Sequence, residues 1–207
     1  MSCFSVFEII KYAVNMVEFE VPIGKQVYTP DGSRINAEYE DPAVARRDKV
    51  IPGDTEDHEA NHAGVAEKTG SRVIRIRIGR RGNVLADTLV DRPNGLAAAV
   101  TIGRDGDYGD RNIVRSMGLP EASTAAAARG IASGIQDEIT EIAKAVTVTG
   151  ELSGTEVREA MKDGKEGRKV VISFRDRNGR NQQEVRTRVK GPVAMVPRVE
   201  YALAQAA

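Results

Sequence analysis

The sequence predicts an α+β fold with a mainly antiparallel sheet built from hairpins. Three observations lead to this prediction. Short segments alternate apolar and polar residues, as half-buried strands do. Glycine-containing turns join neighbouring segments of this kind, and residues 123–146 repeat their apolar positions at helical spacing. Because hairpins stand on both sides of a helical middle, strands and helices are expected in separate runs, which distinguishes the fold from one built of parallel βαβ units.

Residues 1–29 are predicted to form a short amphipathic helix followed by a strand. Charged residues interrupt the apolar N-terminal run, and no basic segment precedes it, so it is not typical of a signal peptide. The strand spans Val17–Val21, where Glu18 and Glu20 share one face and apolar residues share the other. The chain has no run of about 18 apolar residues, so we expect no membrane-spanning segment.

Residues 30–70 are predicted to form an extended polar arm or a long loop. This stretch carries fifteen charged residues and few large apolar ones. On its own it cannot bury enough apolar surface to offset the conformational entropy that is lost on ordering. A structureless segment of this length is unusual inside a compact domain, so we expect a partner subunit to order the arm.

An α+β core is predicted for residues 71–198, and it begins with a hairpin. Val73–Ile78 alternates isoleucine with arginine, and the loop Gly79–Asn83 joins it to a second strand at 84–90. A third strand is predicted at Leu96–Ile102. In the first of these strands the arginines are expected on the polar face, opposite the isoleucines.

A second hairpin is predicted near the end of this core. The dipeptide Asn178-Gly179 separates two strand-like runs, Lys169–Arg177 and Arg180–Lys190. Asn-Gly between alternating runs is the strongest short-range signal for a hairpin. The arginines of the predicted strands and the glutamates of the first strand have opposite charges, so cross-strand pairs are expected if these strands are neighbours. Residues 199–207 are predicted to form a C-terminal tail.

The middle of the core is predicted to be helical. One long helix is expected at about 123–146, because five apolar residues recur at spacings of three and four. These residues are Ile131, Ile135, Ile139, Ile142 and Val146. A shorter helix is expected to begin at Ser153–Glu156, which has the pattern of a capping box, and to end at Asp163-Gly164.

The composition argues against several classes of protein. Lysine and arginine together equal aspartate and glutamate at 30 each, so the net charge is zero, which argues against a general nucleic-acid binder. Tryptophan is absent and aromatic residues make up 4% of the chain, so an aromatic platform for single-stranded nucleic acid is not expected. Cys3 is the only cysteine, which excludes an intrachain disulfide and favours a cytoplasmic protein or a particle assembled in the cytosol.

His58-Glu59-Ala60-Asn61-His62 matches the pattern H-E-x-x-H and contains the only two histidines of the chain. On a helix, His58 and His62 would share a face and could bind zinc, while Glu59 would activate a water molecule. The five residues resemble the signature of zincin metallopeptidases, which implies a zinc-dependent hydrolase. Charged neighbours and nearby glycines are not typical of the buried helix that carries this signature. We therefore interpret the match as a coincidence within the polar arm, without a bound metal, and keep the hydrolase as an alternative.

Two further segments have the composition of binding sites. Asp105–Asp110 is rich in acidic residues, but it lacks the spacing of an EF-hand and is interpreted as a plain turn. Five arginines follow one strand and its loop: Arg72, Arg75, Arg77, Arg80 and Arg81. They could contact phosphate groups, but we expect them to pair with carboxylates instead. Glu18 and Glu20, or an acidic surface on a neighbouring subunit, are the expected partners.

Taken together, these features predict a non-enzymatic structural or assembly protein that forms a homo-oligomer and binds no cofactor. A long arm, few aromatic residues and balanced charge are typical of subunits that reach onto their neighbours, as in a virus or phage particle. Two alternatives are kept. One is the zinc-dependent hydrolase, and the other is a nucleic-acid-binding accessory protein that would use the arginine strand.

Overall fold

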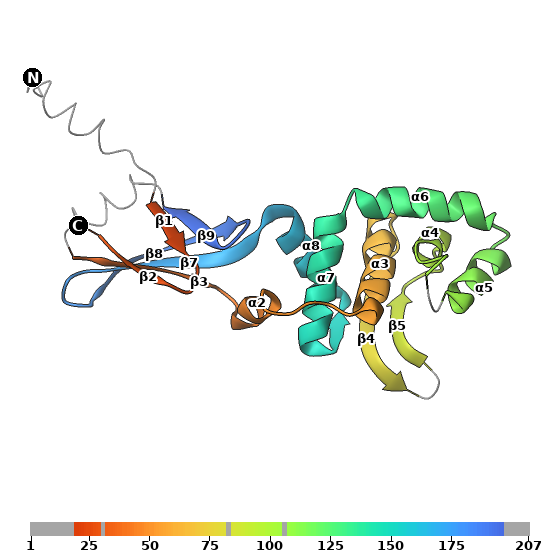
Figure 1. The fold of residues 1–207 in the computed structure, drawn as a ribbon, viewed down its shortest axis with the longest axis horizontal. Coiled ribbons are helices and arrows are strands. Elements are labelled where there is room, and N and C mark those ends of the chain that lie inside the picture. The colour runs from red at the N-terminus through yellow and green to blue at the C-terminus, as the bar shows by residue number, and fades with distance from the viewer. Residues whose placement is uncertain (1–18, 30–31, 82–83, 105–106, 197–207) are drawn as a thin grey trace, which may run out of the picture. The chain divides into compact units, whose positions relative to one another are not determined.

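The computed structural model describes residues 19–29, 32–81, 84–104 and 107–196. It divides into two compact units, which are considered separately (Figure 1). The sheet unit comprises Met1–Asp41 and Gly167–Ala207, and the helical unit comprises Pro42–Glu166. Helices and antiparallel sheets among the described residues confirm the predicted α+β fold. The predicted N-terminal helix and the predicted tail at 199–207 lie outside the described residues.

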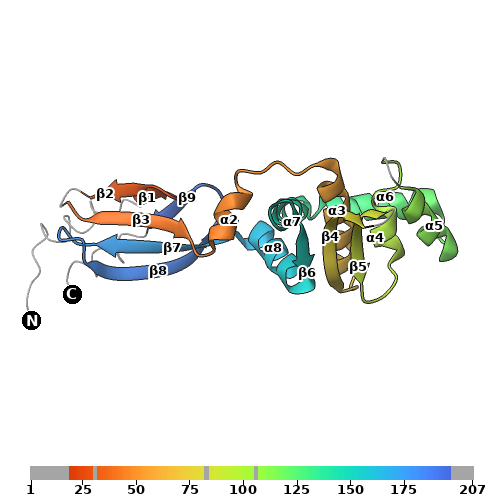
Figure 2. The same ribbon diagram turned by 90° about the horizontal axis from the view of Figure 1, so that it is seen from below.

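The described residues of the sheet unit form only strands: β1 (Phe19–Pro22), β2 (Gln26–Tyr28), β3 (Arg34–Tyr39), β7 (Arg168–Arg175), β8 (Asn181–Val189) and β9 (Val193–Val196). A four-stranded antiparallel sheet has the order β2-β3-β7-β8, and β1 pairs with β9 (Figure 2). The hairpin predicted at Asn178-Gly179 is confirmed as β7–β8, and Gly179 has a φ of 78°, which glycine adopts readily. Val21, Ile35 and Ile172 are fully buried in the core of this unit.

The helical unit contains a three-stranded sheet. Its described elements are α2 (Pro42–Arg47), α3 (Asp54–Lys68), β4 (Val73–Arg81), β5 (Val84–Val90), α4 (Gly95–Ala99), α5 (Tyr108–Ser116), α6 (Glu121–Ser133), α7 (Gln136–Thr149), β6 (Glu151–Ser153) and α8 (Gly154–Glu166). The sheet has the order β5-β4-β6, and its β4–β5 pair confirms the first predicted hairpin. Helix α3 packs against α7 and also against β4 and β5 (Figure 1). No described helix has both the length and the hydropathy needed to cross a membrane.

The prediction of an extended arm at 30–70 is wrong. The described residues of this stretch contain strand β3, the short helix α2 and the 15-residue helix α3. All residues of α3 from Glu59 to Ala66 are buried, and half of them are alanine or glycine. A Cβ atom added at Gly64 would lie 2.8 Å from Cγ1 of Ile139 in α7, which shows how closely the two helices approach. Close packing of alanine and glycine therefore buries this segment without large apolar residues.

The prediction of a strand at Leu96–Ile102 is also wrong, because helix α4 begins at this point. Asn94 caps the helix: its side-chain oxygen accepts a hydrogen bond from the N–H of Ala97 at 2.9 Å. The alanines that follow the cap have the highest helix propensity of all residues. A capping residue in front of an alanine run thus outweighs the apolar character that suggests a strand.

The predicted long helix at 123–146 is divided into α6 and α7. Gly134 follows the end of α6, and Ile135 has a φ of −130°, which lies outside the α-helical region. Most of the predicted apolar stripe is nevertheless buried in the core of the unit. The shorter predicted helix is confirmed as α8, where the carboxylate of Glu156 accepts a hydrogen bond from the N–H of Ser153 at 2.7 Å.

Among the described residues, the strand that carries Glu20 does not pair with the strands that carry the arginines. β1, which carries Glu20, pairs with β9, whereas β4 pairs with β5 and β6, and Glu18 lies outside the described residues. Arg75 and Arg77 of β4 bind one carboxylate, that of Asp87 in β5, at 2.9 and 2.5 Å. Burial raises the pKa of Asp87, but hydrogen bonds from both arginines outweigh this effect and hold the pKa below its usual range. The arginines therefore join the two strands of a single hairpin.

Two helical glycines predict opposite effects of the same substitution. No heavy atom of the described residues lies within 4 Å of a Cβ added at Gly130 of α6, so Gly130→Ala should stabilise the protein by about 0.5–1 kcal/mol through helix propensity. A Cβ at Gly164 of α8 would meet backbone atoms of Asp137 and Glu138 at 2.6 Å, so Gly164→Ala should destabilise it by about 1–3 kcal/mol. Denaturant unfolding measures both changes, and shifts of the same sign would contradict this packing.

The ion pairs of Asp87 predict a contribution to stability that depends on pH. Because folding lowers the pKa of Asp87, its carboxylate stabilises the fold above the unfolded pKa of about 4, and this stabilisation is lost as the pH falls further. At pH 7, Asp87→Asn should lower the free energy of unfolding by about 1 kcal/mol. The difference between the two proteins should shrink toward about pH 2 in denaturant unfolding. A difference that is constant across this range would show that Asp87 does not act through its charge.

Candidate metal centre

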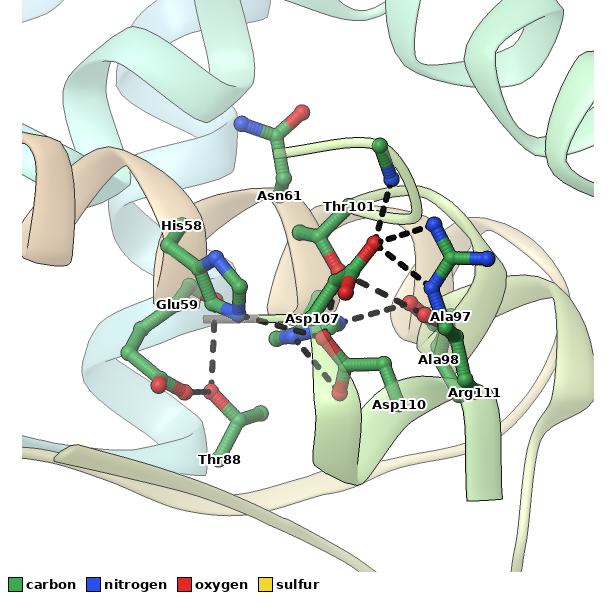
Figure 3. A network of polar contacts seen from close by, with 12 residues as sticks. His58, Glu59, Asn61, Thr88, Ala97, Ala98, Thr101, Asp107, Asp110 and Arg111 are labelled. Atoms are coloured by element: carbon green, nitrogen blue, oxygen red, sulfur yellow. Dashed lines mark hydrogen bonds and ion pairs between the residues drawn. The ribbon is translucent and has the colours of Figure 1, made fainter. Parts of the chain in front are cut away.

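Three side chains that can bind a metal ion converge in the helical unit (Figure 3). His58 and His62 come from α3, and Asp110 comes from the first turn of α5. Nε2 of His58 lies 3.3 Å from Oδ2 of Asp110, and Nε2 of His62 lies 3.4 Å from Oδ1. One ligand atom from each residue lies within 4.8 Å of the other two. The cluster is therefore small enough to surround a single ion.

Helix α3 places both histidines on the same face. Residues four apart are neighbours on the surface of an α-helix, and the two imidazole rings have centroids 4.7 Å apart at an interplanar angle of 77°. The helix begins with Asp54, Glu56 and Asp57, whose negative charges stabilise its N-terminus. These acidic residues suggest a solvated arm in the sequence, but in the structure they support the start of a helix.

A hydrogen bond to α4 orients His62. Its Nδ1 lies 2.7 Å from the carbonyl oxygen of Ala97, which can only accept, so Nδ1 carries the proton. In the neutral ring, the lone pair of Nε2 is then left on the side of Asp110. Ala97 is itself positioned by Asn94, which caps α4 and also donates to the hydroxyl of Thr69 after α3. A hydrogen bond from the second ring nitrogen to a carbonyl is typical of histidines that bind metals.

Asp110 is held in place by neighbouring elements. The hydroxyl of Thr101 donates a hydrogen bond to its Oδ2 at 2.6 Å. The carboxylate of Asp107, just before α5, accepts a hydrogen bond from the N–H of Gly103 at 2.6 Å and pairs with Arg111 at 2.8 Å. These contacts direct one carboxylate of the segment into the cluster and hold the other outside it.

The charges of the cluster favour a cation at its centre. Burial lowers the pKa of His62, but hydrogen bonding to Asp110 and the charges of nearby carboxylates outweigh this effect and raise the pKa. Burial raises the pKa of Asp110, yet His58 and His62 hold it far below its usual range. Asp110 is therefore ionised, and positive charge between it and the imidazoles is stabilised. Either a metal ion or a bound proton can supply this charge.

Glu59 is buried beside the cluster and is held by Thr88 of β5 (Figure 3). The Thr88 hydroxyl lies 2.6 Å from the Glu59 carboxylate and 3.2 Å from the Glu59 backbone oxygen. Glu59 also lies close enough to His62 for its charge to contribute to the raised pKa of that histidine. The carboxylate is thus fixed near the three ligands without being one of them.

A cavity of about 870 Å³ opens onto the cluster. It is bordered by residues of β5, α4 and α5, and its lining includes His58, Glu59, His62 and Asp110. Among the described strands, β5 is an outer strand of its sheet, so backbone groups along one side of it face no neighbouring strand. The cavity therefore gives a ligand access both to the cluster and to the edge of the sheet.

The donor atoms of the cluster suit a zinc ion. Zinc bonds of about 2.0–2.1 Å to nitrogen and oxygen in a tetrahedral site require ligand atoms about 3.3–3.4 Å apart. Nε2 of His58 lies at this distance from Oδ2 of Asp110, and Nε2 of His62 lies at this distance from Oδ1. The three ligand atoms together spread over as much as 4.8 Å, so the cluster would contract slightly around a bound ion. Two histidines and one carboxylate, facing a cavity, form a ligand set found in catalytic zinc sites, and the same types of ligand also bind iron(II).

The structure brings together the three functional residues of the H-E-x-x-H motif but not the other predicted binding residues. Arg75 and Arg77 bind Asp87, and Glu20 belongs to the sheet unit. Outside the described part of the chain lie Glu18, Asp105, Gly106 and the side chains of Arg80 and Arg81. Sequence reasoning missed Asp110 as a ligand and placed it in an acidic turn, because no spacing rule links it to a motif on another helix.

Comparisons with known proteins give no matching family model and no matching curated protein. The interpretation of the site therefore depends on its geometry. The observation of most weight is that two histidines of one helix, a carboxylate from a different helix and a second, fixed carboxylate line one cavity.

The cluster predicts binding of one zinc ion per chain. Zinc at about 100 times its dissociation constant should raise the free energy of unfolding by about 2.7 kcal/mol, because the ion binds only the folded cluster. His62→Ala and Asp110→Ala should lose both the metal and this stabilisation. Asp54→Asn, which changes an exposed acid on the same helix, serves as the control and should retain both. Elemental analysis and thermal unfolding provide the measurement, and a metal-free protein or one that selects iron would contradict the zinc assignment.

Proposed function

We propose that the protein is a metal-dependent hydrolase in which His58, His62 and Asp110 hold a zinc ion and Glu59 acts as the general base. One observation carries this proposal: three ligand atoms meet within 4.8 Å, and a separate carboxylate is fixed on the same cavity. A purely structural zinc site is usually closed by a fourth protein ligand and has no need of a neighbouring base. The set of side chains is therefore better suited to catalysis.

The mechanism assigns a distinct role to each side chain. A bound zinc ion supplies a Lewis acid that polarises a carbonyl group and lowers the pKa of water. Glu59 accepts a proton from the attacking water and later donates it to the leaving group. Thr88 keeps the Glu59 carboxylate oriented through its hydroxyl. The carbonyl of Ala97 keeps the proton of His62 on Nδ1, which leaves Nε2 available as a ligand.

The outer edge of β5 supports a peptide as the substrate. Unpaired N–H and C=O groups of an outer strand can bind an extended chain, which then adds to the sheet as a further strand. β5 borders the cavity from Ala86 to Val90, and Thr88 in the middle of this stretch contacts Glu59. A peptide bound along this edge would carry its backbone past the metal ligands. We therefore propose hydrolysis of peptide bonds.

The other functions suggested by the sequence remain predictions. A structural or assembly role, as part of a particle or another homo-oligomer, was based on an extended arm, and much of that stretch forms β3, α2 and α3. The nucleic-acid alternative was based on the arginine strand, in which Arg75 and Arg77 bind Asp87. No contact among the described residues favours either role over hydrolysis.

Glu59→Gln tests the proposed base. An amide cannot accept the proton, so the variant should keep its zinc and lose about 10²–10⁴-fold in kcat toward casein, an unstructured protein substrate. Asp54→Asn should leave kcat unchanged, since Asp54 lies on the same helix but is exposed at its start. A zinc-loaded protein that does not cleave casein or other unfolded chains, or full activity in Glu59→Gln, would overturn the proposal.

Variants of Thr88 extend the same experiment. Thr88→Val keeps the shape of the side chain and removes the donor to Glu59, so kcat should fall by about tenfold with little change in KM. Thr88→Ser keeps the hydroxyl and should recover most of the activity. An equal loss in both variants would indicate that Thr88 matters for packing and does not position the base.

A further inference from the structure

Part of the cavity wall is apolar although it is open to solvent. Ile113 of α5 and Met117, which directly follows α5, are 44% and 41% exposed, and both line the cavity. Leu89 of β5, at 45%, adds a third exposed apolar side chain to the lining. Single exposed apolar residues are common, but a group of them around one cavity is typical of a binding surface.

The apolar wall lies next to the proposed metal ligands. Ile113 lies three residues after Asp110 in α5, and Met117, which directly follows the helix, lies seven residues after Asp110. Residues at these spacings share one face of a helix. Ala97 and Ala98 of α4 line the same cavity. A substrate whose carbonyl binds at the cluster would therefore have its neighbouring side chain against these apolar residues.

Charged residues at the rim of the cavity already have partners within the protein. Asp87 binds two arginines of β4. Asp91 accepts a hydrogen bond from the N–H of Arg72 at 2.9 Å, and Arg92 donates to the carbonyl of Gly70. These charged groups form contacts within the protein. Beyond the cluster, a ligand in the cavity would therefore contact mainly the apolar side chains.

The packing around Gly95 fixes the position of this wall. A Cβ atom on Gly95 would overlap Cδ1 of Leu119 and would lie 3.4 Å from Sδ of Met117. Because glycine has no side chain, Met117 and Leu119 can pack directly on α4. This packing fixes the position of the apolar wall relative to α4, the helix that also orients His62.

We infer that the cavity selects substrates with a large apolar side chain beside the cleaved bond, and that Ile113 and Met117 contact this side chain. The inference rests on the proposed function, because it takes the metal cluster as the place where the reacting carbonyl binds. A leucine-sized group would remove its own surface and part of two exposed side chains from water, which favours binding. A polar group of equal size would lose hydration without finding a partner on this wall.

Two hydroxamates of similar size test this selectivity on the zinc-loaded full-length protein. N-acetyl-leucine hydroxamate and N-acetyl-asparagine hydroxamate both chelate zinc, and their side chains have the same shape but different polarity. By isothermal titration calorimetry, the leucine compound should bind about tenfold more tightly or better. In Ile113→Asn/Met117→Gln the ratio of the two affinities should fall to about one, with zinc content unchanged.

The control variant is Ile51→Asn, which changes an apolar side chain that is 91% exposed and does not line the cavity. It should keep the parent ratio. If the double variant unfolds, the single variant Met117→Gln should lower the ratio partway. Equal binding of both hydroxamates, binding of neither, or an unchanged ratio in the folded variants would overturn the inference while zinc binding still stands. A protein that binds no zinc would overturn the proposed function, and the inference with it.

Discussion

Residues Glu59–Ala66 of helix α3 are buried although most of them are small or polar, and the packing of the helical unit depends on this segment. Gly64 allows α3 to approach α7 so closely that a single added carbon would meet Ile139 at 2.8 Å. Each buried polar side chain of α3 has a hydrogen-bond partner. Asn61 donates to the Asp57 carbonyl within the helix at 2.7 Å, while His62 and Glu59 bind α4 and β5. The pairing of these polar groups therefore connects α3 to its neighbours and sets the geometry of the metal cluster.

Placing two histidines and two carboxylates largely out of contact with water is unfavourable for the free energy of folding. Replacing buried charged groups by apolar residues of similar size is often neutral or stabilising by about 1–4 kcal/mol. The buried pair of Arg47 and Asp163, 3.2 Å apart, shows how charges inside this unit can neutralise each other without a further ion. The cluster is different, because two imidazole nitrogens face one carboxylate. The pKa values of His62 and Asp110 are both shifted, and shifted groups on a cavity are more typical of a functional site than of a structural one.

Local sequence signals predicted those parts of the fold that depend on local interactions. Asn178-Gly179 specifies its hairpin through turn geometry, and Ser153 with Glu156 specifies the start of α8 through a capping box. The arm prediction failed because it considered only large apolar residues, whereas α3 is buried by alanine and glycine that fit closely against another helix. Asp110 could not be identified as a ligand for a related reason. Its role depends on the packing of α5 beside α3, which no sequence spacing records.

The interpretation of the H-E-x-x-H motif depends on residues that lie elsewhere in the chain. The charged residues before His58 argue against a buried catalytic helix when only neighbours in sequence are considered. In the folded chain, Asp54, Glu56 and Asp57 occupy the first turn, where negative charge favours the helix, and burial begins only at Glu59. The helix is thus polar where it starts and buried from Glu59 onward, beside the candidate metal ligands. An i, i+4 pair supplies two ligands at most, so a metal site needs a third ligand from elsewhere in the fold. Asp110, on another helix, is the candidate for this third ligand.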